Sequence, residues 1–68
     1  MVNRMMRWFT STHLPERLQS VSVECQKLAG WMDTELPESA EKTAGLRKLL
    51  EAKDCFVRAR IEQDTPTN

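Results

Sequence analysis

The sequence predicts an all-α fold: an antiparallel two-helix hairpin with an irregular N-terminal arm, assembled into a homo-oligomer. Two apolar patterns of helical period, separated by a proline, predict the hairpin. The length of 68 residues predicts the assembly, because so short a chain rarely buries enough core to be stable alone. The expected units are the arm (1–13), the hairpin (14–63) and a disordered tail (64–68).

The first helical pattern extends from Leu14 or Pro15 to about Leu36. Pro15 suits the first turn of a helix, and Glu16 is favourable at its positive end. The apolar positions alternate between spacings of four and three residues, which is a heptad seam. They are Leu14, Leu18, Val21, Cys25, Leu28 and Met32.

Pro37 is expected to end the first helix, because proline disfavours helical geometry at the preceding residue. Ser39 is the expected N-cap of a second helix that reaches about Gln63. This helix carries two adjoining apolar stripes, a wider face than one partner helix can cover. The stripes are Leu46, Leu50, Val57 and Ile61, and Leu49, Ala52, Phe56 and Ala59.

The surplus apolar stripe, with Trp31 lying off the seam of the first helix, favours an interface with other copies. The alternative is that the arm folds back and covers this surface through Met5, Trp8 and Phe9.

Residues that face each other in a hairpin turning near Pro37 have numbers summing to about 75. Gly30 and Gly45 are therefore expected to face each other and to allow a close helix–helix approach. The same rule offsets Cys25 and Cys55 by roughly 7 Å along the axis, too far for a relaxed disulfide. Both cysteines are expected to be reduced and buried.

A formal net charge of zero argues against binding to duplex DNA or RNA or to an anionic membrane surface. A single histidine, His13, and no C-x-x-C pair give no basis for a metal site or other cofactor. The N-terminus has no long apolar run, so neither a signal peptide nor a membrane span is expected, and reduced cysteines favour the cytoplasm. No catalytic motif occurs, and we expect no enzyme activity.

Charge is expected to be polarised along the hairpin, with a solvated acidic face near the turn and arginines at the open end. The acidic residues are Asp33, Glu35, Glu38 and Glu41; the basic ones are Arg4, Arg7, Arg17, Arg58 and Arg60. Guanidinium groups beside flat rings and hydroxyls can hold a nucleotide. The candidate ligand-binding residues are Arg7, Trp8, Phe9, Thr10, Arg17, Arg58 and Arg60. On composition alone, solvated arginines and core aromatics are the favoured interpretation.

Five runs of the chain together resemble a known helical hairpin domain. They are Phe9-Thr10, Glu16-Arg17-Leu18-Gln19-Ser20-Val21, Leu36-Pro37-Glu38-Ser39-Ala40-Glu41-Lys42, Gly45-Leu46-Arg47-Lys48-Leu49-Leu50-Glu51-Ala52-Lys53 and Arg58-Ala59-Arg60-Ile61. The domain is that of phage sponge proteins, the anti-CBASS and related anti-Thoeris proteins. Ser22 and Gln63 stand where that family often has basic residues.

The resemblance implies a non-catalytic homohexamer in the host cytoplasm that serves immune evasion. Such a protein binds cyclic dinucleotides or trinucleotides between protomers and so withholds them from immune effectors, with cyclic ADP-ribose-type signals as a further candidate class. The alternative function is an oligomeric interaction module that binds a host protein through its apolar face.

Overall fold

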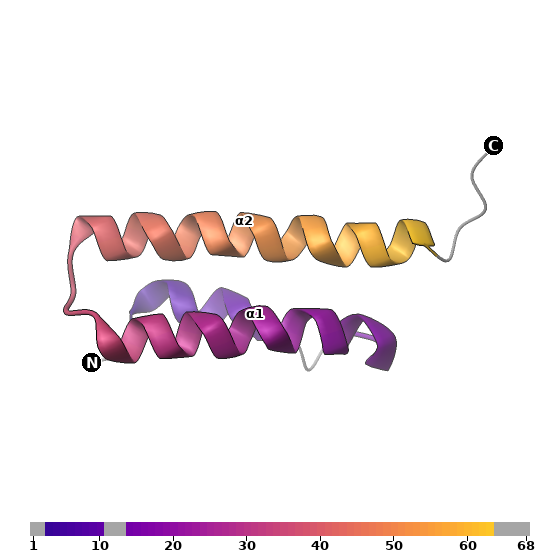
Figure 1. The fold of residues 1–68 in the computed structure, drawn as a ribbon, viewed down its shortest axis with the longest axis horizontal. Coiled ribbons are helices and arrows are strands. Elements are labelled where there is room, and N and C mark those ends of the chain that lie inside the picture. Colours follow the sequence, from indigo (N-terminus) through magenta and orange to yellow (C-terminus); the bar gives the residue numbers. More distant parts are fainter. Residues whose placement is uncertain (1–2, 11–13, 64–68) are drawn as a thin grey trace.

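The structure is a computed structural model that describes residues 3–10 and 14–63. It contains a 3-10 helix, η1 (Arg4–Phe9), and two long helices, α1 (Glu16–Glu35) and α2 (Ala40–Gln63). Figure 1 shows α1 and α2 side by side and antiparallel, with η1 in indigo lying behind them. The predicted two-helix hairpin is confirmed.

The predicted helix ends near the turn are also confirmed. Leu36 leaves the helix with φ −107° and ψ 137°, the extended geometry that Pro37 imposes on the residue before it. Its backbone N–H donates to the carbonyl of Met32 at 3.1 Å. The Ser39 hydroxyl accepts from the backbone N–H of Lys42 at 3.0 Å, so Ser39 caps α2 as its sequence position predicts.

The arm is helical over Arg4–Phe9, and the expectation of an irregular arm is wrong there. The side chain of Asn3 accepts from the backbone N–H of Met5 at 2.9 Å and so caps the first turn of η1. Met5 and Phe9, four residues apart, both point into the hairpin and are buried. Burial of these two side chains holds a short helix that would be marginal in isolation.

The core lies between η1 and the hairpin. Met5, Phe9, Ala29 and Leu46 form it, and Phe9 and Ala29 are both 0 % exposed. The arm therefore does fold back on the hairpin, but it does not cover the surplus surface as the alternative interpretation expects, because Trp31 and Phe56 remain 59 % and 54 % exposed. Trp8 itself is 50 % exposed.

The buried stripe of α1 differs from the predicted heptad seam. Leu18 and Cys25 are buried as expected, but the stripe continues to Ala29, whereas Leu28 is 46 % exposed. Ser22 is also fully buried. The reason is that η1 packs on the side of α1 that carries the small residue Ala29, where a helix can approach closely.

The second helix buries less than its two stripes suggest. Leu46 is buried and Leu49 and Leu50 are half-buried, but Phe56 and Ile61 are exposed. The expected close approach at the glycines is wrong, because among the described residues a Cβ added at Gly30 or at Gly45 would have no packing neighbour within 4 Å beyond the adjacent part of its own helix.

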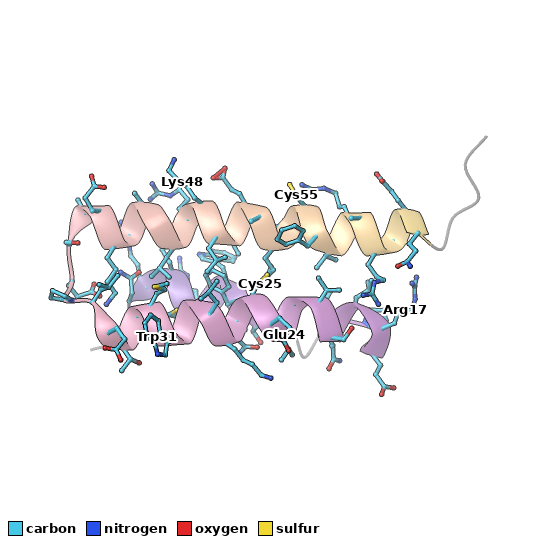
Figure 2. The ribbon with its side chains drawn as sticks, viewed as in Figure 1. Arg17, Glu24, Cys25, Trp31, Lys48 and Cys55 are labelled. Atoms are coloured by element: carbon cyan, nitrogen blue, oxygen red, sulfur yellow. The ribbon has the colours of Figure 1, made fainter. Side chains whose placement is uncertain are left out.

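The two cysteines are free, as expected, but only one is buried. Cys25 points toward α2, whereas Cys55 points away from α1 and is exposed (Figure 2). Burial raises the pKa of the Cys25 thiol. The expected burial of Cys55 is wrong because its face of α2 has no packing partner among the described residues.

Candidate functional site

The seven candidate ligand-binding residues lie in three places. Arg17 and Arg60 lie together at the open end of the hairpin, where they line a shallow cavity of about 640 Å³. Pro15, Glu16 and Ser20 complete that cavity. Two guanidinium groups and one hydroxyl at a rim can hold a phosphate, although Glu16 offsets part of their charge.

Arg58 does not join this pair. It lines a separate small cavity with Leu14, Lys53 and Val57. Its Nη2 donates to the Sγ of Cys55 at 3.4 Å. The candidate cations Arg58 and Arg60 thus belong to different cavities, although they are two residues apart on α2.

The η1 candidates lie along the middle of the hairpin. Lys53, a residue of α2 that is itself buried, donates from Nζ to the carbonyl of Trp8 at 2.9 Å and fixes this position. The guanidinium of Arg7 lies 4.9 Å from the centre of the Trp8 ring, a cation–π pair at the surface. Thr10 is exposed just beyond η1.

Phe9 is fully buried, so its ring cannot serve as a stacking surface for a base while η1 is packed on the hairpin. Arg4 departs from the expected polarity of charge. It lies at the turn end, where it lines a cavity with Glu38, Thr43 and Arg47. Both outcomes follow from the direction of the arm, which begins beside the turn and runs toward the open end.

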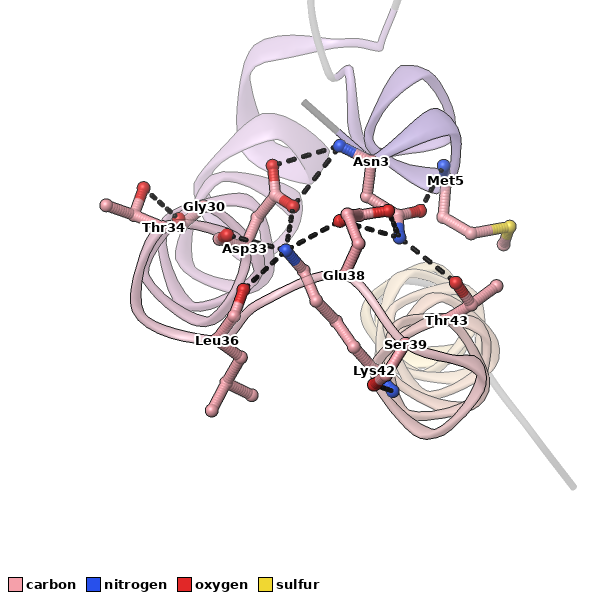
Figure 3. Close-up of polar contacts among 10 residues, drawn as sticks. All are labelled: Asn3, Met5, Gly30, Asp33, Thr34, Leu36, Glu38, Ser39, Lys42 and Thr43. Atoms are coloured by element: carbon pink, nitrogen blue, oxygen red, sulfur yellow. Dashed lines mark hydrogen bonds and ion pairs between the residues drawn. The ribbon is translucent and has the colours of Figure 1, made fainter. Parts of the chain in front are cut away.

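A partly buried ion network at the turn, with Glu38 at its exposed edge, was not foreseen (Figure 3). The Nζ of Lys42 lies 2.8 Å from the Asp33 carboxylate and 2.7 Å from the Glu38 carboxylate. It also donates to the backbone carbonyls of Asp33 and Leu36, at 2.7 and 2.8 Å. The side chain of Lys42 is 3 % exposed and that of Asp33 is 9 % exposed. The expectation that Asp33 belongs to a solvated acidic face is therefore wrong.

Asn3 connects this network to the arm. Its backbone N–H donates to the two carboxylate oxygens of Asp33 at 3.2 and 3.3 Å, and its side-chain amide donates to Glu38 at 3.1 Å and to the Thr43 hydroxyl at 3.1 Å. The hydrogen bond from Lys42 lowers the pKa of Asp33 and of Glu38, and the same two bonds raise the pKa of Lys42. A lysine four residues after Glu38 at a helix start was the available signal.

A groove lined mainly by apolar side chains runs between α1 and α2. At the turn end it contains a cavity of about 510 Å³, and toward the open end a second of about 420 Å³. Leu28 and Leu49 line both cavities, and no residue of η1 lines either. Together the two cavities are named the open groove. Its main apolar residues are Val21, Cys25, Leu28, Met32, Leu36, Leu46, Leu49 and Phe56.

Arg60 lines both the open groove and the cavity that holds Arg17. The apolar groove therefore continues into the arginine-lined end of the hairpin.

Ser22, which stands where the sponge family often has a basic residue, lies in the core, and its hydroxyl has no hydrogen-bond partner among the described residues. Because Ser22 is fully buried, a ligand cannot reach this position in the structure.

Within residues 3–10 and 14–63, no group of histidine, cysteine, aspartate and glutamate side chains is placed to hold a metal ion. His13 lies outside the described residues, as does the predicted tail. None of the described helices is both long enough and apolar enough to span a membrane.

Compared with protein-family models, with curated proteins and with solved structures, the chain shows no match.

Proposed function

We propose that this chain is a sponge: a non-catalytic helical hairpin that sequesters cyclic oligonucleotide second messengers in the host cytoplasm. It does not cleave them, so a ligand recovered from the complex is chemically unchanged. The observation that carries the proposal is the resemblance to phage sponge proteins, which extends over both helices and the turn between them. The hairpin fold is the fold that this resemblance implies.

The proposed phosphate contact is the arginine pair at the open end. Charge-assisted hydrogen bonds from Arg17 and Arg60 to a ring phosphate contribute roughly 1.5–3 kcal/mol each. Among residues 3–10 and 14–63, none that lines that cavity is aromatic, whereas Trp8 is half-exposed on η1. A base stacked on Trp8 of a neighbouring protomer would complete a site between copies, as the resemblance implies, and adds about 1–3 kcal/mol.

Calorimetry against a panel of cyclic dinucleotides, cyclic trinucleotides and cyclic ADP-ribose isomers tests the proposal. We expect at least one member to bind at micromolar concentration or tighter. Because a sponge acts by mass action, chromatography after heat denaturation of the complex should return the ligand unchanged. Linear or mononucleotide products would show that the chain is an enzyme.

Arg17→Ala should weaken binding of that member by tenfold or more, the loss expected for about 1.5 kcal/mol of contact. Arg47→Ala is the matched control, because Arg47 is an exposed arginine at the turn end, away from the proposed site. Equal losses for the two variants would place the site elsewhere.

The second candidate function is an interaction module that binds a host protein, and the open groove is the observation that favours it. A chain that binds no member of the nucleotide panel, but binds a host protein in a manner that Phe56→Glu abolishes, would support this candidate over the sponge. A charge at this position cannot enter a dry interface without a large desolvation cost.

A further inference from the structure

The open groove has a pattern that a second copy of the same chain can fill. It is long and mostly apolar, and its two ends differ in side-chain size, with Gly45 near one end and Phe56 near the other. Each end also carries one acidic and one basic residue: Glu41 and Lys42 at the turn end, and Glu24 and Arg60 at the open end. We infer that a second protomer lies antiparallel in this groove across a two-fold axis, with Phe56 of each protomer seated at Gly45 of the other. This inference rests on the homo-oligomer within the proposed function and not on its ligand.

The first argument is the glycine. Gly45 lines the turn-end cavity of the groove, and a Cβ built there would meet no atom within 4 Å. Packing within one protomer therefore gives no reason for a glycine in the interior of α2, where glycine is a poor helix former. Phe56, which is 54 % exposed, lines the other end of the same groove. An absent side chain at one end and a protruding ring at the other are complementary in shape.

The second argument is charge. Arg60 follows Phe56 by four residues, and Glu41 precedes Gly45 by four residues. Because four residues make about one helical turn, an antiparallel register that places Phe56 over Gly45 also places Arg60 over Glu41. Both charged residues line the groove. One register thus satisfies two independent pairs.

The same register brings Leu49 beside Ala52 of the partner at the two-fold axis, so apolar side chains meet at the centre. A parallel copy would instead bring Arg60 against Arg60 and Phe56 against Phe56. Self-complementarity of this kind defines a two-fold interface, in which the same patch serves on both sides. An unrelated protein would not require the two ends of the groove to complement each other.

Sedimentation of matched glycine variants tests the inference. Wild type is expected to sediment as a dimer or a multiple of one, and Gly45→Leu as a folded monomer whose circular dichroism keeps the helical signal. Gly30→Leu is the control, because the Cβ at Gly30 also meets no atom within 4 Å but Gly30 lies outside the groove. It should keep the wild-type assembly.

A charge exchange tests the register itself. Glu41→Arg and Arg60→Glu should each weaken self-association by roughly tenfold, since the two-fold axis repeats the pair. The double variant should recover most of that loss. A monomeric wild type, an assembly that survives Gly45→Leu, or a double variant no better than the singles would overturn the inference.

Calorimetry on wild type and Gly45→Leu keeps the two proposals apart, because neither sample changes Arg60, which belongs to both. Cyclic nucleotide binding by a monomeric wild type would overturn the antiparallel dimer and leave the sponge standing. A dimer that depends on Gly45 and binds no cyclic nucleotide would support the antiparallel dimer and overturn the sponge.

Discussion

The two faces of the hairpin are built from the same two helices but differ in how they are covered. On one face η1 buries Phe9 against Ala29 and Leu46, and Lys53 donates to its backbone. On the other, the open groove leaves Leu28 and Phe56 about half exposed. The contrast shows that the apolar pattern of α1 and α2 does not decide which stripe is buried. The docking of the arm decides it.

Removing the ring at the centre of the covered face should have the largest effect. Phe9→Ala is expected to lower the free energy of unfolding by about 3–5 kcal/mol, because Phe9 is fully buried and its loss leaves a cavity. Trp8→Ala, at a half-exposed neighbour on the same helix, should lower it by less than about 1 kcal/mol. Urea unfolding at one fixed protein concentration measures both. Equal losses would mean that η1 does not cover this face in solution.

The ion network that holds the start of the arm should make stability depend on pH at both extremes. The pKa values of Asp33 and Glu38 are lowered, so their contribution is complete above their unfolded values of about 3.9 and 4.3 and is lost as the pH falls through the folded values. The pKa of Lys42 is raised, so its contribution is complete below about 10.4 and is lost as the pH rises through the folded value.

Lys42→Met should therefore lower the melting temperature at neutral pH and flatten the acid and alkaline declines, because it leaves Asp33 without its cation. Lys48→Met, at an exposed position of the same helix, should keep the wild-type profile. Thermal unfolding between about pH 3 and pH 11 compares them across the relevant pKa values. If the melting temperatures of the two variants changed with pH in the same way, the network would not contribute to holding the arm on the hairpin.

The smallest expected effect concerns the glycine that lies outside the groove. Gly30→Ala should raise the free energy of unfolding by about 1 kcal/mol, because alanine is the better helix former and its Cβ enters open space. Thermal unfolding at fixed concentration detects a change of this size. A loss of stability would indicate that another part of the protein packs against Gly30. Gly30 would then no longer serve as the glycine outside an interface, in contrast to Gly45.

What the sequence predicted correctly depends on neighbouring residues. The end of α1 before Pro37 and the cap at Ser39 follow from backbone preferences that act over one or two peptide units. The antiparallel hairpin follows from the short turn, and it brings Arg17 and Arg60 together across the open end.

What could not be predicted depends on contacts between distant residues. Asn3 bonds to Asp33, thirty residues away, and nothing in the periodicity of either segment indicates this pair. The rotation of the buried stripe from Leu28 to Ala29 has the same origin, because both positions are apolar and only the docked arm distinguishes them. The burial of Phe9 and the turn-end position of Arg4 follow from the same docking.

The turn-end network also has a consequence for the order of folding. Lys42 bonds to carbonyls only six and nine residues earlier, so closing that loop costs little chain entropy. The arm must instead find partners thirty to forty-five residues away. We expect amide protons of α1 and α2 beside the turn to gain protection before those of η1 in pulse-labelled hydrogen exchange. Until η1 packs on the hairpin, both apolar faces of the hairpin are exposed to solvent. The rate at which η1 packs therefore sets how long two copies can associate through the face that η1 later covers.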